Sequence, residues 1–427
     1  MNTADTTPVT TKAHSAVDDW RAVGDLLALA TERLTAPVEG IHHAIADRWF
    51  GIAGWSGSRG HAAHQKAAET AYRSIRAAGA VTRSTLGIAA VIAADHRSVG
   101  SPWSSPRGAS AQAAANALWG DEFERRASPM HTEPGIRTPD GAHIASTRGA
   151  LARAYPTPTR RLAVFLHGLG KTEHCWHTRV TDTGVVVGMH EALEADGFTP
   201  VLVRYNTGAR VSDTGAALAS LLEEVAANWP TPIDEIALIG HSMGGLVARS
   251  ALHAGRSGDH TWTLSARHLV ALGTPHFGSP IEKGAHLASL MLARTAVSRP
   301  LGEFVDGRSA GIKDMRHGSI HREDPGHHGP DATTPVSVVP RLDGVRHHHA
   351  ASVVTGSASD PIGVLVGDLV VRVTSATGVG PHGRVESDNV RVFGGLNHLA
   401  MLHDGAVVSQ VREWLAPVPA ETMGAKP

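Results

Sequence analysis

This chain has little cysteine, few aromatic residues and no excess of positive or negative charge. Its 427 residues include one cysteine, Cys175, and only 4% are aromatic. A single cysteine excludes an intramolecular disulfide and a cysteine-based zinc site. Lys and Arg number 39 against 40 Asp and Glu, a formal net charge of −1. This balance gives no reason to expect nucleic acid as a partner.

Signals for export and for membrane insertion are also lacking. Residues 1–8 have no basic start followed by an apolar run, as a secretory signal would have. The most apolar stretch, residues 77–94, is interrupted by Gly79, Arg83 and Gly87, which makes it a poor transmembrane helix. These features favour a cytoplasmic protein and leave peripheral membrane contact open. They do not determine the oligomeric state.

Histidine, in contrast, is abundant, at 28 residues. Several gather in the second half of the chain: His317, His321, His327, His328, His347, His348 and His349. A metal site is one interpretation, but the surrounding Gly and Pro residues favour a solvated loop of biased composition. We therefore expect neither a metal ion nor an organic cofactor.

Residues 1–125 are predicted to form a helical extension followed by a linker. Apolar residues between Val23 and Leu34 recur with helical spacing, and residues 41–52 suggest a second helix. The Ala-rich residues 62–94 predict one or two more. Residues 98–116 are rich in Ser, Pro, Gly and Ala, as linkers are. We interpret the helices as an appendage on the main domain; the alternative is a cap, or a surface for a membrane or a partner.

Residues 126–420 are predicted to form an α/β domain. Pro139-Asp140-Gly141 indicates a hairpin turn. Short apolar runs predict strands at residues 161–167, 199–205, 236–239, 269–272, 351–355 and 390–393. Helical patterns alternate with the early runs, at residues 185–196, 212–228 and 244–255, with Ser212 as an N-cap. This alternation predicts a mostly parallel sheet with helices on both faces, and residues 280–345 interrupt it as a lid-like insertion.

The sharpest motif is Gly240-His241-Ser242-Met243-Gly244-Gly245, which fits G-x-S-x-G. An apolar strand precedes it and a helical pattern follows it. Glycines on both sides allow a tight turn that presents the serine in a strained backbone conformation. The setting predicts that Ser242 is a nucleophile; the alternative is a Gly-rich turn with a surface serine.

A second motif, Phe165-Leu166-His167-Gly168-Leu169-Gly170, ends the strand at 161–167. A serine hydrolase needs two backbone N–H groups to bind the oxyanion. We expect these from Met243, which follows the nucleophile, and from Leu169 in this earlier loop. His167 precedes the nucleophile in the chain, and we expect it to be structural. Cys175 is expected to be a small local residue.

These motifs, with Arg204-Tyr205-Asn206-Thr207-Gly208 and Leu272-Gly273-Thr274-Pro275-His276-Phe277-Gly278-Ser279, resemble the α/β-hydrolase superfamily. The resemblance covers about residues 160–415. It is closest to lipase and esterase members related to GPI inositol-deacylase-like serine hydrolases. It implies an α/β-hydrolase fold and a Ser-His-Asp triad, and it does not extend to the N-terminal helices.

The resemblance also implies the order of the triad, which is Ser, then Asp or Glu, then His. Asp368, in Gly367-Asp368-Leu369-Val370-Val371, is the favoured acid, with Asp360 as the alternative. Either aspartate could instead cap a helix. His398, in the loop after the last strand, is the favoured base over His403.

The predicted function is hydrolysis of a carboxylic ester, lipid-like or small, through an acyl-enzyme. The same triad would serve an amidase, a thioesterase or an acyltransferase. A different class, a non-catalytic binding or scaffold protein with a relict hydrolase domain, is disfavoured because no member of the triad is missing.

Overall fold

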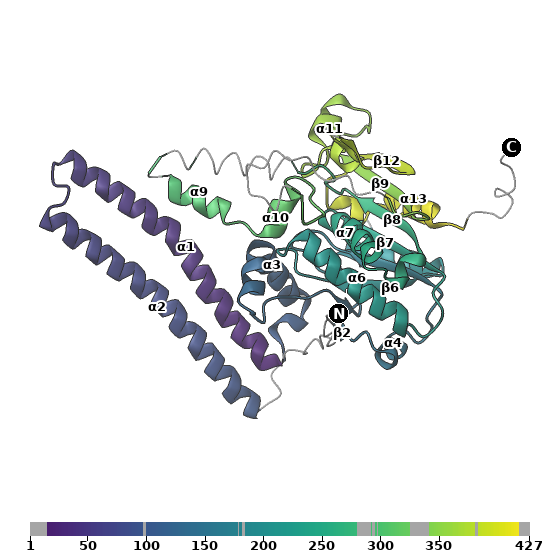
Figure 1. The fold of residues 1–427 in the computed structure, drawn as a ribbon, viewed down its shortest axis with the longest axis horizontal. Coiled ribbons are helices and arrows are strands. Elements are labelled where there is room, and N and C mark those ends of the chain that lie inside the picture. Colours follow the sequence, from purple (N-terminus) through teal and green to yellow (C-terminus); the bar gives the residue numbers. More distant parts are fainter. Residues whose placement is uncertain are drawn as a thin grey trace, which may run out of the picture.

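A mostly parallel eight-stranded sheet forms the centre of the molecule (Figure 1). This computed structural model describes residues 15–96, 100–177, 179–181, 184–279, 292, 295–296, 298–324, 341–380 and 383–417. The strand order is β12-β9-β8-β7-β3-β6-β1-β2. The strands are β1 (Gly135–Arg137), β2 (His143–Ile144), β3 (Arg161–Leu166), β6 (Thr199–Arg204), β7 (Glu235–His241), β8 (Ala266–Leu272), β9 (Arg346–Val353) and β12 (Asn389–Gly394). Neighbours from β12 to β6 pair in parallel, whereas β1 pairs antiparallel with both of its neighbours, β6 and β2.

Helices cover both faces of this sheet. Along β3, Leu162, Val164 and Leu166 belong to one apolar core and Ala163 and Phe165 to the other, as expected for a strand buried on both faces. The first core is closed by α6 (Val211–Asn228) and α7 (Met243–Ser257), and the second by α5 (Met189–Ala195) and α13 (Gly405–Leu415). The predicted α/β-hydrolase architecture is therefore confirmed, together with the hairpin at Pro139-Asp140-Gly141.

Smaller elements connect these layers. The helical ones are η1 (Pro102–Ser104), α4 (Arg148–Ala154), η2 (Glu173–Trp176), η3 (Thr261–Leu264), α9 (Arg299–Asp306), α10 (Ala310–Met315), α11 (Pro361–Val366), α12 (Val373–Ala376) and η5 (Ala400–Leu402). Two small antiparallel ribbons are formed by β4 (Arg179–Thr181) with β5 (Gly184–Val186), and by β10 (Val379–Gly380) with β11 (Gly383–Arg384). The helix predicted from residue 185 thus begins only at Met189.

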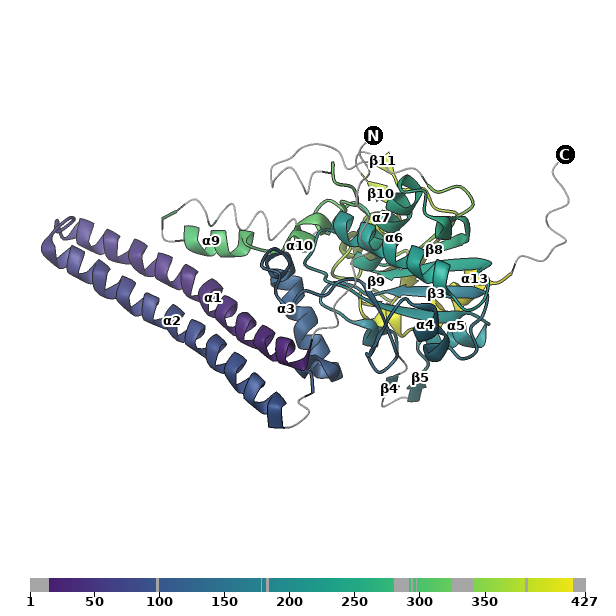
Figure 2. The ribbon, with the colours of Figure 1, turned by 60° about the horizontal axis from the view of Figure 1, so that its bottom comes forward.

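The N-terminal region contains two long helices where three or four shorter ones were predicted. These are α1 (Ala16–Ile52) and α2 (Arg59–His96), which form a hairpin that extends away from the sheet (Figures 1 and 2). Pro37 lies inside α1 without ending it. A proline removes one hydrogen bond from a helix interior, and the packing of α1 against α2 along its length compensates for that loss.

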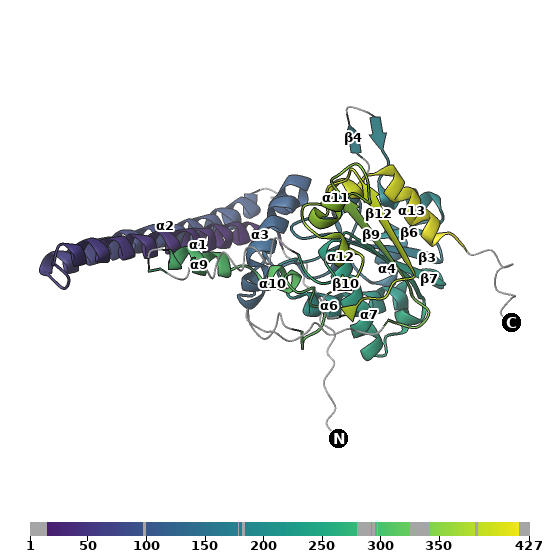
Figure 3. The same ribbon diagram turned by 90° about the horizontal axis from the view of Figure 1, so that it is seen from above.

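The linker predicted at 98–116 is wrong over most of its length, because α3 (Pro106–Arg125) occupies it. Ser105 caps this helix by accepting a hydrogen bond from Gly108 N, and Pro106 takes its first position. Ser and Pro are therefore helix-start signals here. The helix lies between the hairpin and the sheet (Figure 3).

The predicted N-cap at Ser212 is also wrong, since α6 begins at Val211 and its N-cap is Arg210, two residues before Ser212. The cap comes from a distant part of the chain. Asp314, at the end of α10, accepts hydrogen bonds from Val211 N at 2.9 Å and from Arg210 Nη1 at 2.8 Å. A carboxylate at a helix N-terminus is favourable because it compensates the unpaired N–H groups and the positive end of the helix dipole.

The loop predicted around His347–His349 is wrong as well. These three residues lie in β9, with side chains that are almost fully buried. The His348 ring stacks between His268 and Trp414, and the His349 ring stacks on His276. A neutral histidine ring is apolar enough to be buried in a sheet. Histidine is not counted as an apolar residue, however, so a run of histidines is not predicted to be a buried strand. His327 and His328 lie outside the described residues.

The predicted lid-like insertion is described only in part. Residues 280–291 and 325–340 lie outside the described residues. Residues 309–320, in contrast, are built into the domain. A Cβ atom at Gly311 would lie 2.2 Å from Thr207 O and 2.8 Å from Met243 Cε, so α10 touches the residue after Ser242.

Candidate active site

Ser242 occupies a sharp turn between β7 and α7. Its backbone angles are φ 55° and ψ −121°, outside the regions that non-glycine residues normally adopt. The turn is possible because its neighbours are glycines. A Cβ atom at Gly240 would lie 2.4 Å from the Gly244 carbonyl carbon, and one at Gly244 would lie 2.2 Å from Leu166 O. The sequence argument for the glycines therefore agrees with the geometry.

The Ser242 side chain is almost fully buried, with 6% of the residue exposed. Ser242 N donates to Leu272 O at 2.8 Å, which ties the turn to the end of β8. The N-terminus of α7 starts at the next residue, so its dipole favours negative charge beside the serine.

His398 and Asp368 form a buried polar pair near this turn. His398 Nδ1 lies 2.6 Å from Asp368 Oδ2, an arrangement that assigns a proton to Nδ1 and makes the histidine the donor. The other carboxylate oxygen, Oδ1, accepts from Val370 N at 2.9 Å and Val371 N at 2.7 Å. Both residues are buried. Three donors thus fix the carboxylate, and the carboxylate fixes the imidazole.

The second ring nitrogen of His398, Nε2, is buried and has no hydrogen-bond partner among the described residues. With Nδ1 protonated, Nε2 carries the lone pair that can accept a proton. The ring packs where a side chain at Gly273 would stand, 3.1 Å from that Cβ position. Gly273 directly follows Leu272, whose carbonyl binds Ser242 N, so the imidazole and the serine share one end of β8.

His241 makes a contact that the sequence analysis did not predict. Its Nε2 lies 2.9 Å from His398 O, and the two rings are 4.7 Å apart. Burial and the neighbouring His398 lower the pKa of His241 well below its ordinary value, so the ring is neutral and donates from Nε2. The residue before the serine therefore holds the loop that carries the other histidine. Its position inside the G-x-S-x-G motif was the only available signal.

The two candidate N–H groups for an oxyanion lie on the Gly168 loop and at the start of α7. Neither Leu169 N nor Met243 N donates a hydrogen bond within the described part of the chain. The loop approaches the serine closely, because a Cβ atom at Gly168 would lie 3.2 Å from Ser242 Cβ. Gly170 N donates to Thr207 Oγ1 at 3.1 Å, which anchors the loop.

The alternative residues have other contacts. Asp360 is the N-cap of α11, where Oδ1 accepts from Ile362 N and Gly363 N at 2.8 and 3.2 Å. His167 is fully buried and stacks on Tyr205; its Nε2 accepts from Tyr205 N, and its Nδ1 donates to Gly168 O. Burial lowers its pKa to about 4, so it stays neutral. His403 lies in the turn after η5, and Cys175 is a buried thiol in η2.

Metal ligands and membrane-spanning helices were sought in the part of the chain that the structure describes. No group of three or more His, Cys, Asp or Glu side chains there is placed to hold a metal ion. No helix in that part combines the length and the apolar character that crossing a bilayer requires.

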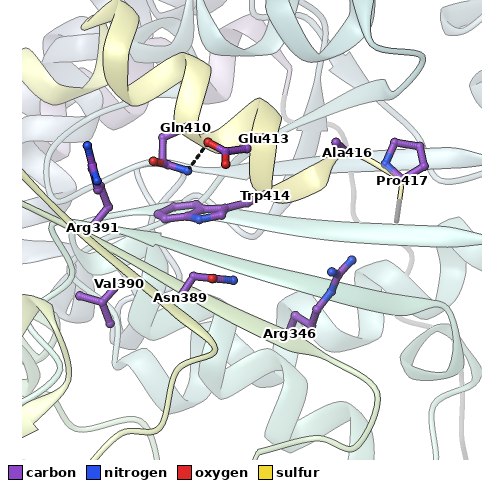
Figure 4. A pocket seen from close by; sticks show the side chains of 9 residues that line it. All are labelled: Arg346, Asn389, Val390, Arg391, Gln410, Glu413, Trp414, Ala416 and Pro417. Atoms are coloured by element: carbon purple, nitrogen blue, oxygen red, sulfur yellow. Dashed lines mark hydrogen bonds between the residues drawn. The ribbon is translucent and has the colours of Figure 1, made fainter. Parts of the chain in front are cut away.

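A groove of about 520 Å³ lies elsewhere on the sheet (Figure 4). Arg346 and Asn389, the first residues of β9 and β12, line it together with Trp414 of α13. Asp368 and His398 follow the opposite, carboxyl ends of those strands. In parallel α/β sheets ligands bind at the carboxyl ends, so this polar groove is separate from the candidate active site.

Comparison with known proteins gives one family and several solved structures. Residues 210–317 match the family described as "PGAP1-like alpha/beta domain". No curated protein matches the chain. Similar solved structures include a Bacillus licheniformis lipase in mature form, at 19% identity over 61% of this chain and 94% of that one, with a TM-score of 0.36. An Enterococcus faecalis α/β-hydrolase superfamily protein gives 14% identity over 66% and 98%, with a TM-score of 0.34.

A third solved structure is a soluble variant of monoglyceride lipase from Saccharomyces cerevisiae with a substrate analogue. It is 13% identical over 61% of this chain and 87% of that one, with a TM-score of 0.32. The order and direction of the strands, with the serine turn between β7 and α7, are independent of these matches. This chain therefore has the α/β-hydrolase fold, and within it residues 210–317 are similar to the PGAP1-like alpha/beta domain.

Proposed function

We propose that this protein is a serine hydrolase that cleaves carboxylic esters, with Ser242 as nucleophile, His398 as general base and Asp368 as the group that orients His398. The observation that carries the proposal is the buried 2.6 Å contact between His398 and Asp368, made at the same sheet edge as the strained Ser242 turn. A strained, buried serine at the sheet edge that also carries an oriented imidazole with an unpaired nitrogen is the arrangement that nucleophilic catalysis needs.

The reaction then proceeds in two halves. His398 Nε2 takes the Ser242 proton while Oγ forms a bond to the ester carbonyl carbon, and the carbonyl electron pair moves to oxygen. The N–H groups of Leu169 and Met243 bind that oxyanion. Its collapse breaks the bond to the alcohol, which leaves with the proton from Nε2. Water repeats the sequence on the acyl-enzyme, releasing the acid and returning the proton to Ser242.

An apolar rim beside the triad supports a lipid-like ester as substrate. We use "apolar rim" for Ile362 and Leu365 of α11 with Leu369 and Leu399. Ile362 and Leu365 are 69% and 68% exposed, and Leu369 and Leu399 adjoin Asp368 and His398 in sequence. Exposed apolar patches mark binding surfaces for apolar partners. Acyl chains entering the site would cover these side chains, and peripheral contact with a lipid surface would do the same.

Covalent labelling tests the nucleophile without any assumption about the substrate. A fluorophosphonate probe should modify the folded protein stoichiometrically at Ser242, located by peptide mass spectrometry. Ser242→Ala should lose labelling and lower ester turnover by about 10³-fold or more, because removal of a triad member eliminates the covalent step. A variant within tenfold of wild type would contradict the assignment.

The rim is tested by comparing ester substrates. Ile362→Ser and Leu365→Ser should raise KM for long-chain esters several-fold and leave short, soluble esters unaffected. Val390→Ser, which also replaces an exposed apolar residue but at the amino end of β12, is the matched control. Equal effects on short and long esters would remove the support for a lipid-like substrate. Hydrolysis of the matching amides but not the esters would favour an amidase.

A further inference from the structure

The hairpin of α1 and α2 projects from the domain in all three views (Figures 1, 2 and 3). Its two helices pack closely, since a Cβ atom at Gly24 would lie 2.9 Å from Arg83 Cα. Asp25 pairs with Arg83 at 2.5 Å, and His42 Nδ1 lies 3.0 Å from the Tyr72 hydroxyl. The sides of α1 and α2 that face each other are therefore covered by these contacts.

One side of α1, next to its contact with α2, carries a continuous apolar stripe. We define the α1 stripe as its exposed large apolar side chains: Leu27, Leu34, Val38, Ile45, Trp49 and Ile52. Their separations of seven, four, seven, four and three residues keep all six on one side of a helix. This spacing is that of helices that pack along their whole length against a neighbouring helix. Between 43% and 70% of each residue is exposed.

Contacts with the rest of the described chain leave the stripe uncovered. The first turns of α1 bury Ala22 and Leu29 against Phe123 of α3. Gly40 faces Pro300 of α9, where a Cβ atom would lie 2.5 Å from the Pro300 ring. The second helix adds exposed apolar residues of its own: Ile75, Val81, Ile88, Val91 and Ile92. An uncovered apolar surface of this length on a projecting element indicates a missing partner.

The charges of the two helices are complementary. Over Ala16–Ile52 six acidic and three basic side chains give a net charge of −3, and over Arg59–His96 two acidic and five basic side chains give +3. A second hairpin related by a two-fold axis would place each α1 beside the partner's α2. Such an arrangement sets helices of opposite net charge side by side, so no net repulsion opposes it, while Asp25 and Glu39 of α1 already pair with Arg83 and Arg76 of α2 within one hairpin. The acidic character of α1 disfavours an anionic lipid surface as the occupant.

We propose that the hairpin is a dimerisation element, and that the α1 stripe packs against the hairpin of a second copy of this chain in an antiparallel four-helix bundle. Helices of 37 and 38 residues are each about 55 Å long at 1.5 Å per residue. A contact strip about 10 Å wide on each helix would bury roughly 1,000 Å² per copy. Stable protein interfaces bury about 800 Å² per partner, so the surface is large enough.

The test measures the mass of the full-length protein in solution by light scattering. The wild type should have twice the monomer mass of 44.7 kDa and should dissociate on dilution. Leu34→Glu and Ile45→Glu place a charge in the stripe and should give monomers. Ala36→Glu adds the same charge to an exposed position of α1 outside the stripe and should remain dimeric. Helical content and Ser242 labelling should be unchanged in all three variants, since the stripe is distant from the active site.

Three results would overturn the proposal. One is a wild type that is monomeric at every concentration. Another is a dimer that survives both stripe substitutions, because the contact would then lie elsewhere. The third is a monomeric wild type that floats with neutral or anionic phospholipid vesicles through the same two residues, since a lipid surface would then be the occupant. Loss of Ser242 labelling in the wild type would contradict the proposed catalytic function but not this one.

Discussion

At the scale of single residues, two aspartates on neighbouring loops have different tasks. The Asp368 carboxylate binds the His398 ring and two backbone N–H groups, whereas the Asp360 carboxylate binds only the first N–H groups of α11. Both carboxylates accept several hydrogen bonds, so hydrogen bonding alone does not separate them. What separates them is the presence of an imidazole among the donors.

Paired substitutions make this difference measurable. Asp368→Asn should lower kcat by about 10³- to 10⁴-fold, because the histidine loses the acceptor that holds its tautomer. Asp360→Asn should leave kcat within about threefold and reduce the free energy of unfolding by no more than about 1 kcal/mol, since Asn is also a good N-cap. Steady-state kinetics and thermal unfolding of both variants provide the comparison. A larger loss of kcat at position 360 would reverse the assignment of the acid.

At the scale of elements, β9 carries an unusual load of buried titratable groups. Burial lowers the pKa of His347 to about 3 and those of His348 and His349 to about 4. On the neighbouring strand β8, burial lowers the pKa of His268 to about 3. All four rings must therefore stay neutral in the folded protein, while in the unfolded chain their pKa is close to 6.5.

This difference predicts acid lability. Above about pH 6.5 both states are neutral at these histidines, and their stability contribution is complete. As the pH falls from 6.5 towards 4, these histidines are protonated in the unfolded chain but stay neutral in the folded chain. Each histidine then lowers the free energy of unfolding by about 1.4 kcal/mol per pH unit. Denaturant unfolding of the wild type at a series of pH values measures the slope.

A single substitution isolates one of these contributions. Both ring nitrogens of His347 are buried without a partner among the described residues, so His347→Leu removes a titrating group and no side-chain hydrogen bond. The variant should be as stable as wild type near pH 7.5. Below pH 6.5 its free energy of unfolding should fall less steeply with pH, because its unfolding takes up about one proton fewer. A wild-type slope of zero between about pH 6.5 and 5 would show that these rings titrate normally.

At the scale of the whole molecule, α3 joins the N-terminal region to the sheet domain. Its backbone is in close contact with the Asn206-Thr207-Gly208 loop: Asn206 Nδ2 donates to Gly120 O at 2.9 Å, and a Cβ atom at Gly208 would lie 1.9 Å from Asn116 O. Ser309 Oγ donates to Ala117 O at 2.6 Å. We therefore propose that the boundary between extension and domain lies near residue 100, rather than at residue 125.

Two truncated chains distinguish these boundaries. A chain beginning at Gly100 retains α3 and should fold and react with the fluorophosphonate probe, with a modest loss of stability where Ala22 and Leu29 no longer cover Phe123. A chain beginning at Arg126 lacks α3, exposes buried parts of the domain and should unfold or lose several kcal/mol of stability. Thermal unfolding and labelling of both chains provide the measurement. Equal behaviour of the two would show that α3 belongs to the extension.

The sequence by itself determined the elements whose signal is local. The alternation of short apolar runs with helical patterns predicted the α/β sheet, because the period of apolar residues depends only on neighbouring positions. The glycines around Ser242 predicted the tight turn, since only residues without a Cβ fit beside crossing backbone. Asp368 and His398 were predicted from the order of motifs in related hydrolases.

The tertiary structure decided whatever depends on contacts between distant residues. The Asp314 cap of α6 lies about a hundred positions from the helix that it caps, and no local pattern reports it. His347–His349 resemble a polar loop in sequence, and they become core residues only because side chains such as Trp414 and His276 pack on the two faces of the folded sheet. The Ser- and Pro-rich segment around Pro106 became a helix because the sheet domain offers it a surface on which to pack. Burial, which is a property of the folded chain and not of any residue, is the common reason.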